Sequence, residues 1–341
     1  MRAILRALFF FILLSTHAFA DNNVQSLIDS GAIRDCFLGD GTLQLAYKGL
    51  QSLEGLENTP QAQTITLIDL SHNQISSLKG CILKNFPKLT QLWLNNNNLE
   101  DISGLGGVDG VQKLVVLNLA HNRIKHVPHG IFKNFGNLEI IFFNNNQLSS
   151  FACLGGLTNL RELHCAYNKL NILDLQHCAQ FPMLYILNVG FNRITLIKPM
   201  KYGCLDNLEM LFLNNNIISE VPSCAFARCP CLLALYLHNN AIRQLQPNCF
   251  AGLGNLRLMY LYNNAITKLP ANIFSDLCCM HLLYLRNNVI QVLEKGWNKG
   301  LDSLQVLDFS YNNLSDSVDV EAKGSASIKN LKYFLRTSSR T

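Results

Sequence analysis

Apolar residues recur along this chain in a fixed arrangement around a series of asparagines. An apolar residue stands three, five and eight positions before each asparagine, and another stands two positions after it. The spacings between the asparagines are 24, 25, 24 and 22 residues, and then 24 six times. The eleven asparagines are Asn73, Asn97, Asn122, Asn146, Asn168, Asn192, Asn216, Asn240, Asn264, Asn288 and Asn312. A period in the twenties predicts one structural unit stacked eleven times.

The segment from Leu208 to Ile218 indicates how one unit folds. Leu211 and Leu213 alternate with Phe212, which predicts a short strand with both leucines in the core and Phe212 facing outward. Asn216 is expected in the following turn. Its amide should bind backbone groups of its own coil and of the neighbouring coil, because buried polar groups must be paired. Stacked strands of this kind predict a parallel sheet.

A second set of apolar residues, each pair three positions apart, predicts the opposite wall of the core. The pairs are Phe132 with Phe135, Phe226 with Cys229, Phe250 with Leu253, and Phe274 with Leu277. The whole pattern resembles leucine-rich repeats of the typical subclass, whose motif ends L-P-x-x-x-F-x-x-L-x-x-L, over about residues 40 to 315. One match is Val127, Pro128, Phe132, Phe135 and Leu138. The resemblance implies an α/β repeat fold, a right-handed horseshoe-shaped solenoid with a parallel concave β-sheet.

Members of this subclass include Toll-like receptor ectodomains, small extracellular proteoglycans, jawless-vertebrate antigen receptors and exported bacterial virulence proteins. They share protein recognition on the horseshoe, so the resemblance implies a protein partner. Animal extracellular members usually carry cysteine-rich caps, whereas here only Cys36 precedes the repeats and no cysteine follows Cys279. One glycosylation acceptor is present, Asn313-Leu314-Ser315. These features favour the bacterial exported type over the animal extracellular type. For an exported bacterial protein of this kind, the resemblance implies a role in host interaction.

The first twenty residues have the pattern of a secretory signal peptide. Arg2 and Arg6 precede an apolar stretch, and Ala18-Phe19-Ala20 fits a small-residue cleavage site. We therefore expect residues 1–20 to be removed and the protein to be secreted, either extracellular or, in a bacterium, periplasmic or on the outer surface. The alternative is a membrane anchor, but the stretch is shorter than the roughly 20 apolar residues of a spanning helix. We expect no membrane span after cleavage.

The periodicity weakens at both ends of the repeats, where a solenoid needs caps. We predict an N-terminal cap with a degenerate repeat over residues 21–64, leucine-rich repeats over 65–315, and a C-terminal cap and tail over 316–341. A short helix is expected in the first cap, with Val24 and Leu27 on one face.

Charge and cysteine content exclude several other classes of function. The formal charge of +5 is mild and scattered, so we expect no nucleic-acid partner, and no glycine-rich phosphate loop suggests a cofactor. Cys224 and Cys249 lie at nearly the same phase of successive coils, so a disulfide between them is possible. Other cysteine spacings do not match zinc sites, so no metal is expected.

The outward-facing strand positions carry the functional prediction. Six of the eleven central positions are aromatic and are proposed as partner-binding anchors: Trp93, Phe142, Phe212, Tyr236, Tyr260 and Tyr284. Exposed aromatic residues with a polar rim are typical of protein interfaces. The alternative is a purely structural role, in which these rings only pack against one another across the strands. Glycan binding, or self-association as a structural protein of the envelope or extracellular matrix, are the other functions that such a surface could serve.

An enzyme is not expected from this sequence. His164 beside Cys165 has the composition of a base with its nucleophile, but adjacent strand residues face opposite sides of the sheet. The imidazole should therefore face outward and the thiol inward, so the two groups cannot meet.

Overall fold

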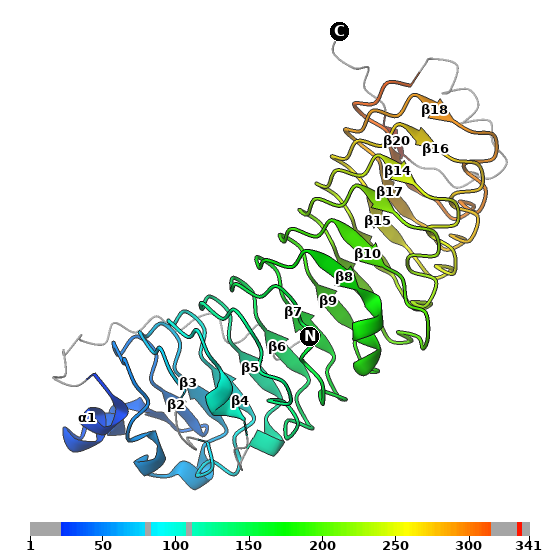
Figure 1. Ribbon diagram of the computed structural model, residues 1–341. Coiled ribbons are helices and arrows are strands. Elements are labelled where there is room, and N and C mark those ends of the chain that lie inside the picture. The colour runs from blue at the N-terminus through cyan, green and yellow to red at the C-terminus, as the bar shows by residue number, and fades with distance from the viewer. Residues whose placement is uncertain (1–21, 79–82, 107–110, 315–332, 336–341) are drawn as a thin grey trace.

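The computed structural model describes residues 22–78, 83–106, 111–314 and 333–335. These residues form a curved solenoid that runs from the helix α1 (Val24–Asp29) at one end to the strand β20 (Tyr333–Leu335) at the other (Figure 1). The predicted horseshoe of about eleven coils with a large parallel concave sheet is confirmed. The predicted signal peptide lies outside the described residues, as do Ser315 of the glycosylation acceptor and most of the predicted C-terminal cap.

Each coil contributes one three-residue strand to the concave sheet. The strands are β3 (Leu67–Asp69), β4 (Gln91–Trp93), β5 (Val116–Asn118), β6 (Ile140–Phe142), β7 (Glu162–His164), β9 (Ile186–Asn188), β11 (Met210–Phe212), β13 (Ala234–Tyr236), β15 (Leu258–Tyr260), β17 (Leu282–Tyr284) and β19 (Val306–Asp308). They pair in parallel and in register, so the third residue of each strand lies opposite the third residue of the next. The middle residue of every strand is buried.

The concave sheet continues beyond the eleven coil strands at both ends. Strands β1 (Phe37–Leu38) and β2 (Thr42–Gln44) pair in an antiparallel hairpin, and β2 then pairs in parallel with β3. Helix α1 precedes them and buries Val24 and Leu27, while the side chain of Asn23 caps its first turn. At the other end, β20 pairs in parallel with β19.

The opposite wall of the core is built from short 3-10 helices, turns and three two-stranded sheets. The sheets are β8 (Ile172–Asp174) with β10 (Leu196–Lys198), β12 (Glu220–Val221) with β14 (Gln244–Leu245), and β16 (Lys268–Leu269) with β18 (Val292–Leu293). The 3-10 helices are Ala32–Cys36, Leu56–Asn58, Ala62–Thr64, Ser103–Leu105, Val111–Lys113 and Leu175–Gln180. The predicted phenylalanine pairs are buried here, and the ring of Phe132 meets the edge of Phe135 at 5.2 Å.

The asparagine of each coil binds its own coil to the preceding one. The Nδ2 group of Asn216 donates to the Leu213 carbonyl at 3.0 Å and to the Val189 carbonyl of the preceding coil at 3.1 Å. Its Oδ1 accepts from the Ile194 amide, also of the preceding coil, at 2.9 Å. The predicted role of Asn216 is confirmed. The side chain supplies partners to backbone groups that the turn would otherwise leave unpaired.

The residue before each asparagine has a left-handed backbone. Its φ is 55° at Asn215, 56° at Asn239 and 55° at Asn263. Asparagine is enriched in this conformation, whereas bulky residues seldom adopt it. Tyr167 and Phe191 nevertheless occupy the same position with φ of 56° and 53°.

Candidate interaction surface on the concave sheet

Four of the predicted anchors form one continuous column on the C-terminal half of the sheet. The rings of Phe212 and Tyr236 are stacked with centroids 4.3 Å apart and an angle of 8° between their planes. Tyr260 follows at 5.3 Å from Tyr236, and Tyr284 at 4.9 Å from Tyr260, both tilted by just over 40°. The parallel register of β11, β13, β15 and β17 places these four side chains side by side.

Stacking determines which part of each ring is offered to a partner. Because Phe212 and Tyr236 stack on each other, one face of each ring is closed to a partner. All four rings are half-buried. Burial, followed by the neighbouring Tyr260, raises the pKa of Tyr236, and burial, Tyr260 and Asp308 raise that of Tyr284. The rings therefore pack against one another and still present a surface to solvent.

The other two predicted anchors are separate from this column. Trp93 lies between Asp69 and Asn118 in the sheet register, and its indole Nε1 is buried without a partner among the described residues. Phe142 stacks on His164 at 4.8 Å. Asn188 then lies between His164 and Phe212, so the aromatic column is interrupted there.

His238 and Tyr262, which follow the strands β13 and β15, also belong to the aromatic cluster. The imidazole of His238 stacks on Tyr262 at 4.5 Å and meets the edge of the Tyr260 ring at 5.7 Å. Burial lowers the pKa of His238, and its Nδ1 atom has no hydrogen-bond partner in the described part of the chain. We call the cluster of Phe212, Tyr236, Tyr260, Tyr284, His238 and Tyr262 the aromatic surface.

An asparagine ladder borders the aromatic surface. Asn239 donates to the side chain of Asn215 at 3.1 Å, Asn263 donates to Asn239 at 2.7 Å, and Asn287 donates to Asn263 at 2.8 Å. The ladder has one asparagine per coil, just as the aromatic column has one ring per coil. Because each amide fixes the next, the ladder gives the aromatic surface an ordered polar edge.

Sequence reasoning missed an apolar column beyond this ladder. Ile217 and Val289 are exposed by 52% and 40%, and Ala241 and Ala265 occupy the equivalent position in the two coils between them. The sequence signal for this column is the residue directly after each asparagine. That residue is polar or basic on the N-terminal coils and changes to an apolar residue on the C-terminal coils from Ile217 to Val289.

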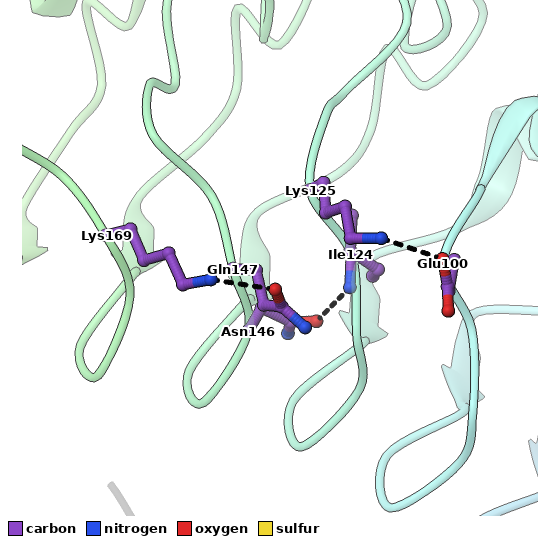
Figure 2. A network of polar contacts seen from close by, with 6 residues as sticks. All are labelled: Glu100, Ile124, Lys125, Asn146, Gln147 and Lys169. Carbon is purple, nitrogen blue, oxygen red and sulfur yellow. Dashed lines mark hydrogen bonds and ion pairs between the residues drawn. The ribbon is translucent and has the colours of Figure 1, made fainter.

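The N-terminal coils show a different, polar edge (Figure 2). Lys125 forms an ion pair with Glu100 at 3.0 Å, and Lys169 donates to the side chain of Gln147 at 2.8 Å. Between them, Asn146 accepts from the Ile124 amide at 3.0 Å, which repeats the arrangement at Asn216. The exposed apolar residues at this edge are thus concentrated on the C-terminal coils.

A second group of missed aromatic residues lies at the left-handed position before each asparagine. Tyr167 and Phe191 stack at 4.2 Å and are 49% and 38% exposed. Tyr47 stacks on His72 at 4.3 Å at the N-terminal end of the same column. The sequence signal was available, because these positions follow the same period as the asparagines.

The structure separates the residues that could have formed a catalytic pair. His164 faces outward, where its Nε2 atom lies 3.0 Å from a carboxylate oxygen of Glu162, while Cys165 is buried in the core. Burial raises the pKa of the Cys165 thiol well above its ordinary value, so it is not poised as a nucleophile.

The other cysteines of the described segments are free thiols. Cys224 is exposed and Cys249 is buried, and a disulfide between them stays a prediction. Burial and the nearby Cys204 raise the pKa of the Cys229 thiol to about 12. Over the described ranges, no three His, Cys, Asp or Glu side chains gather closely enough to hold a metal ion. Within the same ranges, no helix has the length and apolar character to cross a membrane.

Comparison with protein families agrees with this architecture. A leucine-rich-repeat model matches residues 112–181, 182–242, 234–290 and 280–332, and a model of two leucine-rich repeats matches residues 63–107. The predicted resemblance to leucine-rich-repeat proteins is confirmed.

Known proteins share this fold at low sequence identity. Asporin of Bos taurus is 33% identical over 66 residues, which are 19% of this chain and 18% of asporin. A chain of the Drosophila Toll–Spatzle complex superimposes with a TM-score of 0.72 at 21% identity, over 86% of this chain and 40% of its own length. A chain from the octameric complex of latrophilin 3, Unc5D and FLRT2 superimposes with a TM-score of 0.74 at 20% identity, over 89% of this chain and 91% of its own length. This chain thus spans less than half of that chain of the Toll–Spatzle complex and about a fifth of asporin.

Proposed function

Because this chain belongs to the leucine-rich-repeat family, we propose that it is a scaffold that binds a protein partner through the aromatic surface on β11, β13, β15 and β17. The observation that carries the proposal is the unbroken column of half-buried rings from Phe212 to Tyr284. Aromatic side chains contribute most of the binding energy in many protein interfaces. Trp93 and Phe142 are proposed as separate, secondary contacts on the N-terminal coils.

The asparagine ladder and the apolar column support the same location. The ladder of Asn215, Asn239, Asn263 and Asn287 lies between the aromatic surface and the exposed Ile217 and Val289. A partner that covers the rings and extends over the edge would bury apolar area on both sides of a polar row. Such an arrangement resembles a hydrophobic interface core with fixed hydrogen-bonding groups for specificity.

Ring geometry favours a protein over a glycan. A sugar commonly stacks its CH face on an exposed aromatic face, but the faces of Phe212 and Tyr236 cover each other at 4.3 Å. The ring edges and tyrosine hydroxyls that remain suit side chains and backbone groups of a polypeptide. Self-association through the same surface, as in a structural protein of the envelope or matrix, is the competing function.

We propose an extracellular location and no enzymatic role. The predicted signal peptide over residues 1–20 supports export, as does the resemblance of the repeats to secreted leucine-rich-repeat proteins. The outward-facing His164 and the buried Cys165 support a binding role over a catalytic one. A part in host interaction is compatible with export of such a scaffold.

The test is partner capture by variants of the purified protein. Tyr236→Glu combined with Tyr260→Glu places two carboxylates in the centre of the aromatic surface, where a dry interface cannot accommodate them. Tyr47→Glu combined with Tyr202→Glu is the matched control, because both tyrosines are exposed and the change in charge is the same. Circular dichroism establishes that all three proteins are folded.

The proposal expects a protein that cross-links to the wild type and to the control but not to the Tyr236/Tyr260 variant. Equal capture by both variants would reject the aromatic surface as the binding site. Capture of a second copy of the chain, with concentration-dependent dimers in sedimentation, would favour the structural role.

A further inference from the structure

Charge is distributed unevenly between the two halves of the solenoid. Between Glu220 and Glu294 the sequence contains one acidic residue, Asp276, and five basic residues. The basic residues are Arg228, Arg243, Arg257, Lys268 and Arg286. Asp276 lies away from the concave sheet, where its carboxylate accepts from the Gly252 amide at 2.8 Å. The coils that carry most of the aromatic surface therefore have a net positive charge.

Two arginines lie beside the aromatic surface at opposite ends of its strands. Arg257 directly precedes β15, and its carbonyl accepts from the first residue of β17, Leu282, at 3.0 Å. Arg286 follows Tyr284 by two residues, beyond the end of β17, and its guanidinium lies over the ring of Tyr311 at 4.6 Å. Both arginines are exposed. A ligand on the tyrosine column would therefore meet a guanidinium on each side.

The middle coils of the concave sheet carry carboxylates instead. Glu139 lies 3.5 Å from Arg161, and Glu162 lies 3.0 Å from His164. Glu209 interacts with the hydroxyl of Tyr185 and raises its pKa. These acids are already associated with local partners. Among the described residues, neither Arg257 nor Arg286 forms an ion pair, and Asp308, beside Tyr284 in the sheet, is the carboxylate at the C-terminal end of the surface. These two guanidinium groups therefore distinguish the C-terminal coils by charge.

From these observations we propose that the aromatic surface takes an acidic, extended polypeptide segment, with apolar side chains on the rings and carboxylates toward Arg257 and Arg286. This proposal rests on the proposed function and names the chemical class of the partner. Four parallel strands about 4.8 Å apart span roughly 15 Å, the length of about five residues of extended chain. Adjacent amides of the asparagine ladder are available along one side to bind its backbone.

The probe is a library of random twelve-residue peptides displayed on phage and selected on the immobilised protein. Enriched peptides are then synthesised with a fluorescent label, and their affinity is measured by anisotropy. The test variant is Arg257→Gln with Arg286→Gln. The matched control is Arg123→Gln with Arg193→Gln, because these arginines are exposed on the N-terminal coils and the change in charge is identical.

We expect the selected peptides to be rich in Asp and Glu among apolar residues. Their affinity should fall by about tenfold in the Arg257/Arg286 variant, from two partly exposed ion pairs, and stay within about twofold in the control. Binding should also weaken as salt is raised. Neutral or basic peptides, equal losses in both variants, or no enriched peptide at all would overturn the proposal.

The Tyr236→Glu and Tyr260→Glu variant distinguishes this proposal from the broader one. Neutral peptides that lose affinity only in the tyrosine variant would reject the acidic partner and retain binding at the aromatic surface. Peptides that bind both the tyrosine variant and the arginine variant as tightly as the wild type would reject both proposals.

Discussion

The ring of Phe212 lies parallel to the ring of Tyr236, with 4.3 Å between centroids and 8° between planes. These residues occupy the same place in neighbouring strands, so the solenoid itself brings the two rings together. The pairing then extends through Tyr260 to Tyr284. A single outward position, repeated once per coil, is thereby converted into a continuous aromatic surface.

The stacking of Phe212 on Tyr236 predicts measurable coupling between them. In a double-mutant cycle of Phe212→Ala and Tyr236→Ala, the free energies of unfolding should be non-additive by about 1 kcal/mol. Urea denaturation followed by circular dichroism measures this coupling. The pair Phe212→Ala and Tyr202→Ala should be additive, because Tyr202 is 76% exposed and lies on another coil wall. Additivity in both pairs would contradict the stacking.

Asn216 is expected to be among the least replaceable residues. Asn216→Ala removes the acceptor of the Ile194 amide and the donor to the Leu213 and Val189 carbonyls. Unpaired buried groups of this kind cost about 1 to 3 kcal/mol each, so we expect a loss of about 3 kcal/mol in the free energy of unfolding. Asn171→Ala is the control, since Asn171 is exposed. A loss below about 1 kcal/mol at Asn216, measured by urea denaturation, would contradict this account.

Close packing between coils predicts different tolerance at two glycines. Gly300 has a φ of 89°, and a methyl group there would overlap the carbonyls of Phe274 and Ser275 in the preceding coil. Gly130 has a φ of 74° but nothing within 4 Å of such a methyl group. Gly300→Ala should therefore lower the melting temperature by several degrees more than Gly130→Ala. Equal shifts in calorimetry would indicate that backbone strain alone matters.

The burial of His238 predicts a loss of stability on acidification. Its pKa is lowered in the folded protein, so the unfolded chain binds the proton more readily. The contribution of His238 is complete above the unfolded pKa of about 6.5 and is lost as the pH falls toward the lower folded pKa.

Urea midpoints at pH 7.5 and pH 5 test this sign. The decrease between these values should be smaller in His238→Gln than in the wild type. His126→Gln, at an exposed position, should leave the decrease unchanged. Identical decreases in all three proteins would show that the imidazole of His238 does not titrate differently on folding.

Most of the fold follows from the spacing of residues such as Leu211, Leu213 and Asn216. Their period fixes which side chains are inside and which backbone groups need a partner, and the same alternation places Phe212 and Tyr236 outward. The details of the aromatic surface depend on side-chain orientation. The repeat pattern does not determine side-chain rotamers. It therefore does not predict the angles between the ring planes, the packing of His238 on Tyr262, or the cation–π contact of Arg286 with Tyr311.

The edge of the solenoid was also only partly predictable. Asparagine readily adopts a left-handed backbone, as it does at Asn215. Phe191 adopts the same conformation at the equivalent position despite its bulk. Neighbouring coils impose one turn geometry on every residue at that place. The positions directly before and after each asparagine repeat with the same period as the strands, and they carry Tyr167 and Phe191 before it and Ile217 and Val289 after it.

Photo-cross-linking from a single position of the aromatic surface tests the central claim most directly. A benzophenone side chain is introduced at Tyr260, and at Tyr202 as the control, in the purified protein exposed to extracts that contain the captured partner. The account predicts a cross-linked partner from position 260 and none from position 202. A partner cross-linked from position 202 and not from 260 would contradict binding at the concave aromatic surface.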